Sequence, residues 1–117
     1  MDICFLDSYH SLAYKAMFNT KLLEYMACGK PVIAGDIAEN SYLLKNCGII
    51  IPPCKMRKRF LNDYVSRISQ AVEVLMDDEK MRVNLGKKAR EKAVALFDWK
   101  KLTKKLYDIY MITLGLA

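Results

Sequence analysis

The 117-residue sequence has a single histidine, His10, and its four cysteines, at positions 4, 28, 47 and 54, form no Cys-x-x-Cys pair. Such a set provides neither the ligands of a zinc site nor the disulfide framework of a small secreted protein. We therefore expect no metal and four reduced cysteines. Cys4 and Cys28 fall within apolar segments, so we predict that both act as small hydrophobic residues of the interior.

Membrane-spanning and catalytic signatures are also missing. No apolar run approaches the roughly 18 residues of a membrane span, and no signal peptide is found. Glycine-rich phosphate loops, nucleophile elbows and metal-ligand clusters are absent too. These absences predict a cytoplasmic protein, or one held peripherally at a membrane, and they identify no catalytic residue.

Composition and charge limit the class of protein. Hydrophobic residues make up 53% of the chain, enough for the packed core of one domain. The net charge is +6, and Lys/Arg residues gather between Lys80 and Lys105, where only Glu91 and Asp98 oppose them. We favour a solvated face of two helices for this basic segment. Contact with an anionic membrane is an alternative, whereas nucleic-acid binding has only this charge behind it and is not predicted.

The first half of the chain alternates strand and helix patterns. Strands are predicted at residues 3–6, 31–35 and 48–51, and helices at residues 19–28 and 40–46. Gly29 with Pro31 ends the first helix, and Gly48 ends the second. Near-continuous apolar strands joined by helices form a parallel sheet covered on both faces. We therefore predict an α/β fold in which residues 1–53 form a βαβαβ unit with a three-stranded parallel sheet.

Residues 54–117 are predicted to be helical after a flexible loop over residues 54–59. The first helix has an inward stripe of Leu61, Tyr64, Val65, Ile68, Ala71, Val72 and Leu75 and ends at Asp77-Asp78. A second runs to about Phe97, with Met81, Leu85, Ala89, Ala93 and Leu96 inward. Asp98 caps a third, which carries Trp99, Leu102, Leu106, Ile109, Tyr110 and Thr113 on a stripe predicted to lack a partner in this chain.

The helix that begins at Asn19-Thr20 is the candidate binding element. A helix N-terminus that follows a strand in an α/β domain presents unpaired amides and a partial positive charge, which suits phosphate. Glu24 lies four residues after Thr20, outside capping-box spacing, so its carboxylate is available to a sugar diol. The alternative is that Glu24 interacts only with the helix dipole. The loop at residues 7–18, at the carboxyl end of the first strand, adds further candidates: Ser8, Tyr9, His10, Ser11, Tyr14 and Lys15.

Three segments together resemble one enzyme family. Residues 23–34, LEYMACGKPVIA, resemble the segment with the second glutamate of the E-x7-E motif in retaining GT-B glycosyltransferases (glycosyl transferases group 1). Residues 47–53 resemble that family's Gly-hydrophobic-hydrophobic-Pro strand. Residues 85–90 with Phe97-Asp98-Trp99 resemble its C-terminal signature, and order and spacing agree over about residues 1–110.

The resemblance implies a role for each matching residue. Glu24 would hold the ribose hydroxyls of a nucleotide-sugar, and backbone amides around Asn19, Thr20 and Lys21 would face its diphosphate. No cofactor is implied, because the nucleotide-sugar is a substrate. Ala16 stands where the motif has its first glutamate.

The resemblance also implies that residues 1–117 form a single partial Rossmann-like domain, without the acceptor-binding domain and the first half of the donor domain. The predicted function is the donor-binding portion of a glycosyltransferase, inactive as this chain alone. The alternative is a non-catalytic binding or assembly module, or a split-enzyme subunit. Such a chain would complete its sheet with a partner chain or by self-association.

Overall fold

The computed structural model describes residues 2–7, 11–53 and 58–117. Three short strands form a parallel sheet in the order β1-β2-β3, with β1 at Cys4–Leu6, β2 at Val32–Gly35 and β3 at Ile49–Ile51. In the register Phe5 is paired with Ile33, and Ile33 with Ile49. The predicted α/β class and three-stranded parallel sheet are therefore confirmed.

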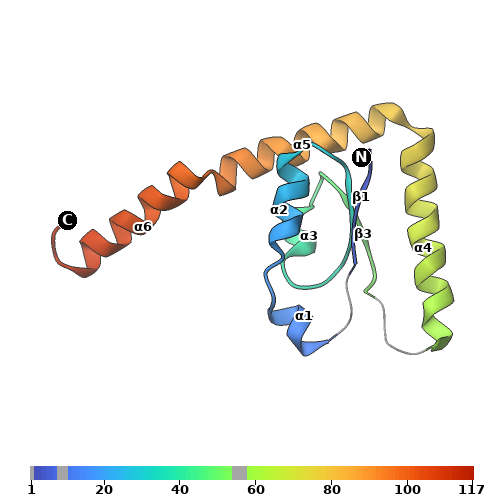
Figure 1. Cartoon of the computed structure of the whole chain (residues 1–117), viewed down its shortest axis with the longest axis horizontal. Coiled ribbons are helices and arrows are strands. Elements are labelled where there is room, and N and C mark those ends of the chain that lie inside the picture. Colours follow the sequence, from blue (N-terminus) through green and yellow to red (C-terminus); the bar gives the residue numbers. More distant parts are fainter. Residues whose placement is uncertain (1, 8–10, 54–57) are drawn as a thin grey trace.

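Helices cover both faces of the sheet (Figure 1). On one face, α2 (Thr20–Ala27) and α3 (Asn40–Leu43) bury Leu22, Met26 and Leu43 against β1 and β2. On the other face, α4 (Lys58–Asp77) buries Tyr64, Ala71 and Leu75 against Ile33 and Ile51. Both faces of the apolar strands are thus shielded from water, and this burial of apolar surface is the main stabilising term of the fold.

A long helix, α5 (Glu79–Phe97), crosses the amino ends of the strands and joins the two layers (Figure 1). The break predicted at Asp77-Asp78 precedes it, and Asp78 is its N-cap, with Oδ1 accepting a hydrogen bond from the Met81 amide at 2.8 Å. Ala89 and Ala93 are buried against the α2 side of the core. Leu96, predicted inward, is 38% exposed, and its neighbour Phe97 packs against Phe18 instead, with ring centroids 6.4 Å apart.

The segment at residues 7–18 is not the uninterrupted loop that we predicted. It contains a five-residue helix, α1 (Leu12–Ala16), whose N-cap Ser11 accepts a hydrogen bond from the Tyr14 amide at 3.2 Å. Residues 54–57 of the other predicted loop lie outside the described residues, as does His10. Lys58 and Arg59, which we assigned to that loop, begin α4.

Gly48 does not end the helix before it. The left-handed residue after α3 is Asn46, with φ 65°, a conformation that asparagine tolerates. A Cβ at Gly48 would lie 2.9 Å from the Val32 carbonyl oxygen and 2.8 Å from Leu44 Cδ2. The glycine is therefore required for the close approach of β3 to β2 and α3.

Two further predictions of burial were wrong. Leu61 and Val65 of α4 are 49% and 51% exposed, because a sheet of three short strands covers only a narrow stripe of that helix. Cys28 is exposed at the C-cap of α2, whereas Cys4 and Cys47 are buried. Cys54 lies outside the described residues.

The last helix, α6 (Trp99–Thr113), extends away from the body of the molecule (Figure 1). Asp98 caps it as predicted, and no residue of α6 is buried. The radius of gyration is 17.0 Å, compared with about 13 Å for a compact chain of near this length. The predicted apolar stripe of α6 therefore has no covering element in the described chain.

Candidate functional site

A cavity of about 380 Å³ lies between the carboxyl end of β1 and the start of α2. Its lining residues come from β1 and the residue after it, from α1 and its C-cap, and from α2 with its N-cap: Phe5, Leu6, Asp7, Tyr14, Met17, Asn19, Lys21 and Tyr25. Open α/β sheets bind ligands outside the carboxyl ends of their strands. The cavity lies where the sequence predicts the ligand.

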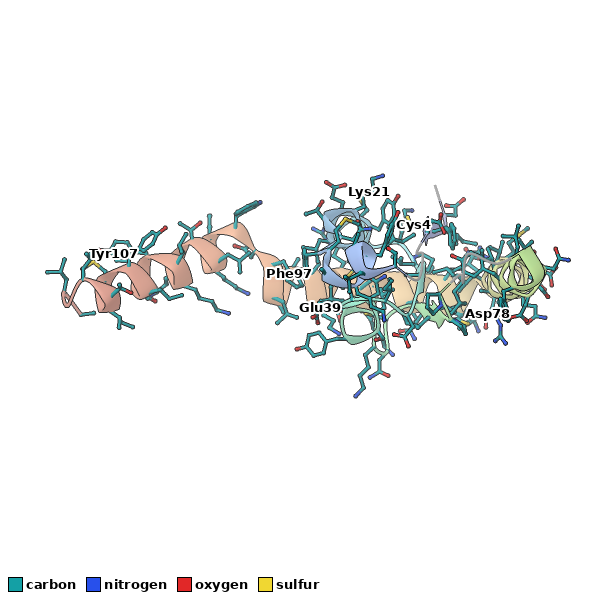
Figure 2. The ribbon with its side chains drawn as sticks, turned by 90° about the horizontal axis from the view of Figure 1, so that it is seen from below. Cys4, Lys21, Glu39, Asp78, Phe97 and Tyr107 are labelled. Atoms are coloured by element: carbon teal, nitrogen blue, oxygen red, sulfur yellow. The ribbon has the colours of Figure 1, made fainter. Side chains whose placement is uncertain are left out.

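The N-terminus of α2 is capped by the chain itself. Asn19 Oδ1 accepts a hydrogen bond from the Lys21 amide at 3.1 Å, and the Asn19 carbonyl oxygen accepts one from the Leu22 amide at 3.1 Å. One of the amides predicted to meet phosphate, that of Lys21, is thus already satisfied, as is the next amide of the helix, that of Leu22. Lys21 lines the cavity and supplies a full positive charge there. Its side chain is exposed and lies at the surface of the molecule (Figure 2).

The predicted binding residues divide into two groups. Asn19 and Lys21 line the cavity. Thr20 and Glu24 are exposed and are not among the lining residues. Lys21 and Tyr25, one helical turn apart, form the cavity face of α2, and Glu24 lies beside that face.

The candidates in the preceding loop also divide. Tyr14 lines the cavity, Ser11 is used as the cap of α1, and Lys15 is exposed. Ser8, Tyr9 and His10 lie outside the described residues. Ala16 is the last residue of α1 and is exposed, so no carboxylate occupies the position of the first glutamate of the motif.

Sequence reasoning missed Asp7, which lines the cavity directly after β1. Its Oδ1 accepts a hydrogen bond from the Tyr64 hydroxyl at 3.0 Å. Tyr64 comes from α4 and is only 7% exposed. The sequence does show that Asp7 is the first polar residue after a strand, which is a signal for a ligand-side residue. It does not show that Tyr64, 57 positions away, is its hydrogen-bond partner.

The C-terminal end of α2 is held by α5. The Arg90 guanidinium donates a hydrogen bond to the Ala27 carbonyl oxygen, where a cation also complements the negative end of the helix dipole. Ala89, one residue earlier, is fully buried against the same core. Residues 85–90 therefore fix α2, and with it the position of the cavity.

A larger groove of about 680 Å³ lies on α5, lined by Gly29, Val83, Lys87, Arg90, Glu91, Val94, Ala95 and Lys101. It is shallow and lies at the amino ends of the strands, away from the capped start of α2. Among the residues that the structure describes, no group of three His, Cys, Asp or Glu side chains is placed to hold a metal. No helix in the same residues is long and apolar enough to cross a membrane.

The sequence profile of the family "Glycosyl transferases group 1" matches residues 2–92. The chain belongs to this family. Among curated proteins, none matches this chain.

Two solved glycosyltransferase structures share its fold. Sucrose-phosphate synthase from Thermosynechococcus elongatus superposes with a TM-score of 0.78 at 24% identity, over 99% of this chain and 26% of that one. Anabaena HepE in complex with UDP-glucose gives a TM-score of 0.75 at 17% identity, over 93% of this chain and 27% of that one. The Rossmann-like GT-B fold is thus confirmed, and this family member spans about a quarter of the solved chains that it matches.

Proposed function

We propose that this chain is the nucleotide-sugar-binding portion of a glycosyltransferase. The observation that carries the proposal is the cavity at the carboxyl end of β1, with Lys21 and the start of α2 on its wall. Membership of the family supports glycosyl transfer. The UDP-glucose complex of the similar HepE structure supports a nucleotide-sugar as the ligand.

In this proposal the chain acts by binding and by charge. Transfer breaks the bond between the sugar and the diphosphate, so negative charge develops on the departing phosphate oxygen. The Lys21 ammonium and the positive end of α2 stabilise that charge. Glu24, exposed beside the cavity, accepts hydrogen bonds from ribose hydroxyls, and the Asn19 cap fixes where the helix starts.

The proposal makes the nucleotide-sugar a substrate and requires no cofactor. Because the chain spans about a quarter of the similar solved chains, we assign acceptor binding and the remaining donor contacts to other parts of the enzyme. We therefore propose that the chain binds donor but transfers no sugar alone.

The test is an NMR titration of the isotope-labelled chain with UDP-glucose, a method that detects weak binding. We expect saturable shifts of the amides of Asp7, Thr20 and Lys21. A Lys21→Ala variant is expected to lose affinity, while Lys87→Ala, which removes the same charge from α5, retains it. Absence of saturable shifts, or shifts confined to α5, would refute the proposal.

A second candidate function is an assembly module that pairs with a second copy of this chain. Two observations favour it: Ile109, Tyr110 and Ile112 of α6 are 58% to 69% exposed, and β1 and β3 are both edge strands of the described sheet.

Light scattering after size exclusion tests this candidate. A dimer mass without UDP-glucose binding supports the assembly module, and a monomer contradicts it. Salt-sensitive binding to anionic vesicles would instead assign α6 and the Lys80–Lys105 segment to a membrane surface.

A further inference from the structure

The hydrogen bond between Tyr64 and Asp7 joins the cavity to the opposite layer of the fold. Tyr64 lies on α4, 93% buried against the sheet face away from α2, and its hydroxyl donates to Asp7 Oδ1 at 3.0 Å. A phenol held by a packed ring can point its hydroxyl in few directions. Since a hydrogen bond to a charged acceptor is strong and directional, the carboxylate of Asp7 is held in one orientation at the cavity wall.

The negative and positive charges of the cavity wall lie on different sides of the cavity. Among the lining residues that the structure describes, Asp7 carries the one negative charge and Lys21 the one positive charge. Asp7 lies on the strand side, and Lys21 lies on the side of the α2 N-terminus. A phosphate is repelled by the first and attracted by the second, whereas a carboxylate is a good acceptor for sugar hydroxyls.

We propose that Asp7 accepts hydrogen bonds from hydroxyl groups of the nucleotide-sugar, and that Tyr64 is the positioning residue that orients it. This inference rests on the proposed function and adds to it the orientation of the bound nucleotide-sugar. The diphosphate lies toward Lys21 and α2, the ribose hydroxyls lie at Glu24, and the transferred sugar lies toward Asp7 and β1. The competing role for the pair is structural, as a bond that fastens α4 to the end of β1.

Two ligands separate these roles: UDP-glucose, which carries hydroxyls and diphosphate, and inorganic pyrophosphate, which carries only the latter. We expect Asp7→Asn to weaken UDP-glucose binding roughly tenfold, the effect of losing a hydrogen bond to a charged group. Pyrophosphate binding is expected to be unchanged or tighter, because a negative charge is removed. Tyr64→Phe, which keeps the packed ring, is expected to weaken UDP-glucose binding about threefold and leave pyrophosphate binding unchanged.

Matched controls lie away from the cavity. Asp63→Asn removes a carboxylate that pairs with Arg67 on the exposed face of α4, and Tyr107→Phe removes an exposed hydroxyl on α6. Neither change is expected to alter the affinity for either ligand. If Asp7→Asn does not fold, the ratio of the two affinities in Tyr64→Phe decides.

Four outcomes would overturn the inference. Equal losses for both ligands would make Asp7 and Tyr64 a structural pair. Wild-type affinity of Asp7→Asn for UDP-glucose would remove Asp7 from the site while leaving the proposed function standing. Pyrophosphate binding that requires both Mg²⁺ and Asp7 would make the carboxylate a metal ligand. Failure of the wild-type chain to bind UDP-glucose would overturn the proposed function as well.

Discussion

Gly86 of α5 lies against the backbone of Gly29, so close that a Cβ at Gly86 would be 2.1 Å from the Gly29 carbonyl oxygen. Gly29 ends α2 in the left-handed conformation, with φ 68°. Gly29 is therefore required for its conformation, and Gly86 for the space that it leaves to the Gly29 backbone. The Leu-Gly stretch at residues 85–86, part of the family resemblance, acts here by letting α5 pack directly on the end of α2.

Gly86→Ala should destabilise the fold. The added methyl group meets backbone atoms that cannot rotate away, so α5 and α2 must separate. We expect a loss of about 2–3 kcal/mol in the free energy of unfolding, measured by urea denaturation. Asn84→Ala, an exposed change on the same helix, serves as the control, and a Gly86→Ala variant as stable as that control would contradict the contact.

Apolar residues of α4 and α6 should differ sharply in their contribution to stability. Leu75 of α4 is fully buried and Ile109 of α6 is 58% exposed. Leu75→Ala is expected to cost about 2–5 kcal/mol, and Ile109→Gln to change the free energy of unfolding by less than about 0.5 kcal/mol. Urea titrations of the dilute chain measure both. A large loss for Ile109→Gln would show that α6 is covered in solution.

Stability should fall in alkaline solution because of a buried thiol. Burial raises the pKa of Cys47 above its ordinary value of 9.0, although Lys92 and Lys88 oppose the shift. As the pH rises, the thiol loses its proton in the unfolded chain before it does so in the folded chain. The contribution of Cys47 to the free energy of unfolding is therefore complete below pH 9.0 and is lost as the pH rises through the higher pKa of the folded chain.

The free energy of unfolding is measured below pH 9.0 and at alkaline pH above the pKa of Cys47 in the folded chain. Between these two conditions it is expected to fall less in Cys47→Ala than in the wild type. Cys28→Ala changes an exposed thiol and should retain the wild-type fall. An equal fall in all three proteins would exclude Cys47 as the cause.

Glu24→Gln tests the acid predicted from the sequence. If Glu24 binds ribose hydroxyls, the neutral amide should weaken UDP-glucose binding about threefold, a small effect because the side chain is exposed and solvent competes. Calorimetry or NMR titration measures it. Glu73→Gln, on the exposed face of α4, is the control, and unchanged affinity in Glu24→Gln would remove its role.

Features set by neighbouring residues were predictable. The Asn19 cap, the end of α2 at Gly29, the break at Asp78 and the apolar strands all follow from interactions within a few positions of the chain. The family resemblance rests on the same local segments, which explains why it identified both fold and family.

Features set by distant contacts were not predictable. Asp7 joins the candidate site through Tyr64, and Gly48 is required because β2 and α3 lie against it. Helical periodicity placed Leu61, Val65 and Leu96 inward, but how much of a helix is covered depends on the width of its partner. The five-residue helix α1 buries none of its residues, so the sequence has no helical pattern of apolar residues from which it could be predicted.

The packing of α5 on the C-terminal end of α2 has a consequence for variation among related chains. Arg90 and Gly86 of α5 contact the C-terminal end of α2, where α5 crosses the amino ends of the strands (Figure 1), while the cavity lies at the carboxyl end of β1. At the N-terminal end of α2, Leu22 is buried in the core, but Thr20, Lys21 and Glu24 are exposed and carry little of the packing that holds the helix. If the cavity binds a nucleotide-sugar as proposed, exchanges of these exposed residues are expected to change which donor binds while the folding free energy stays nearly constant.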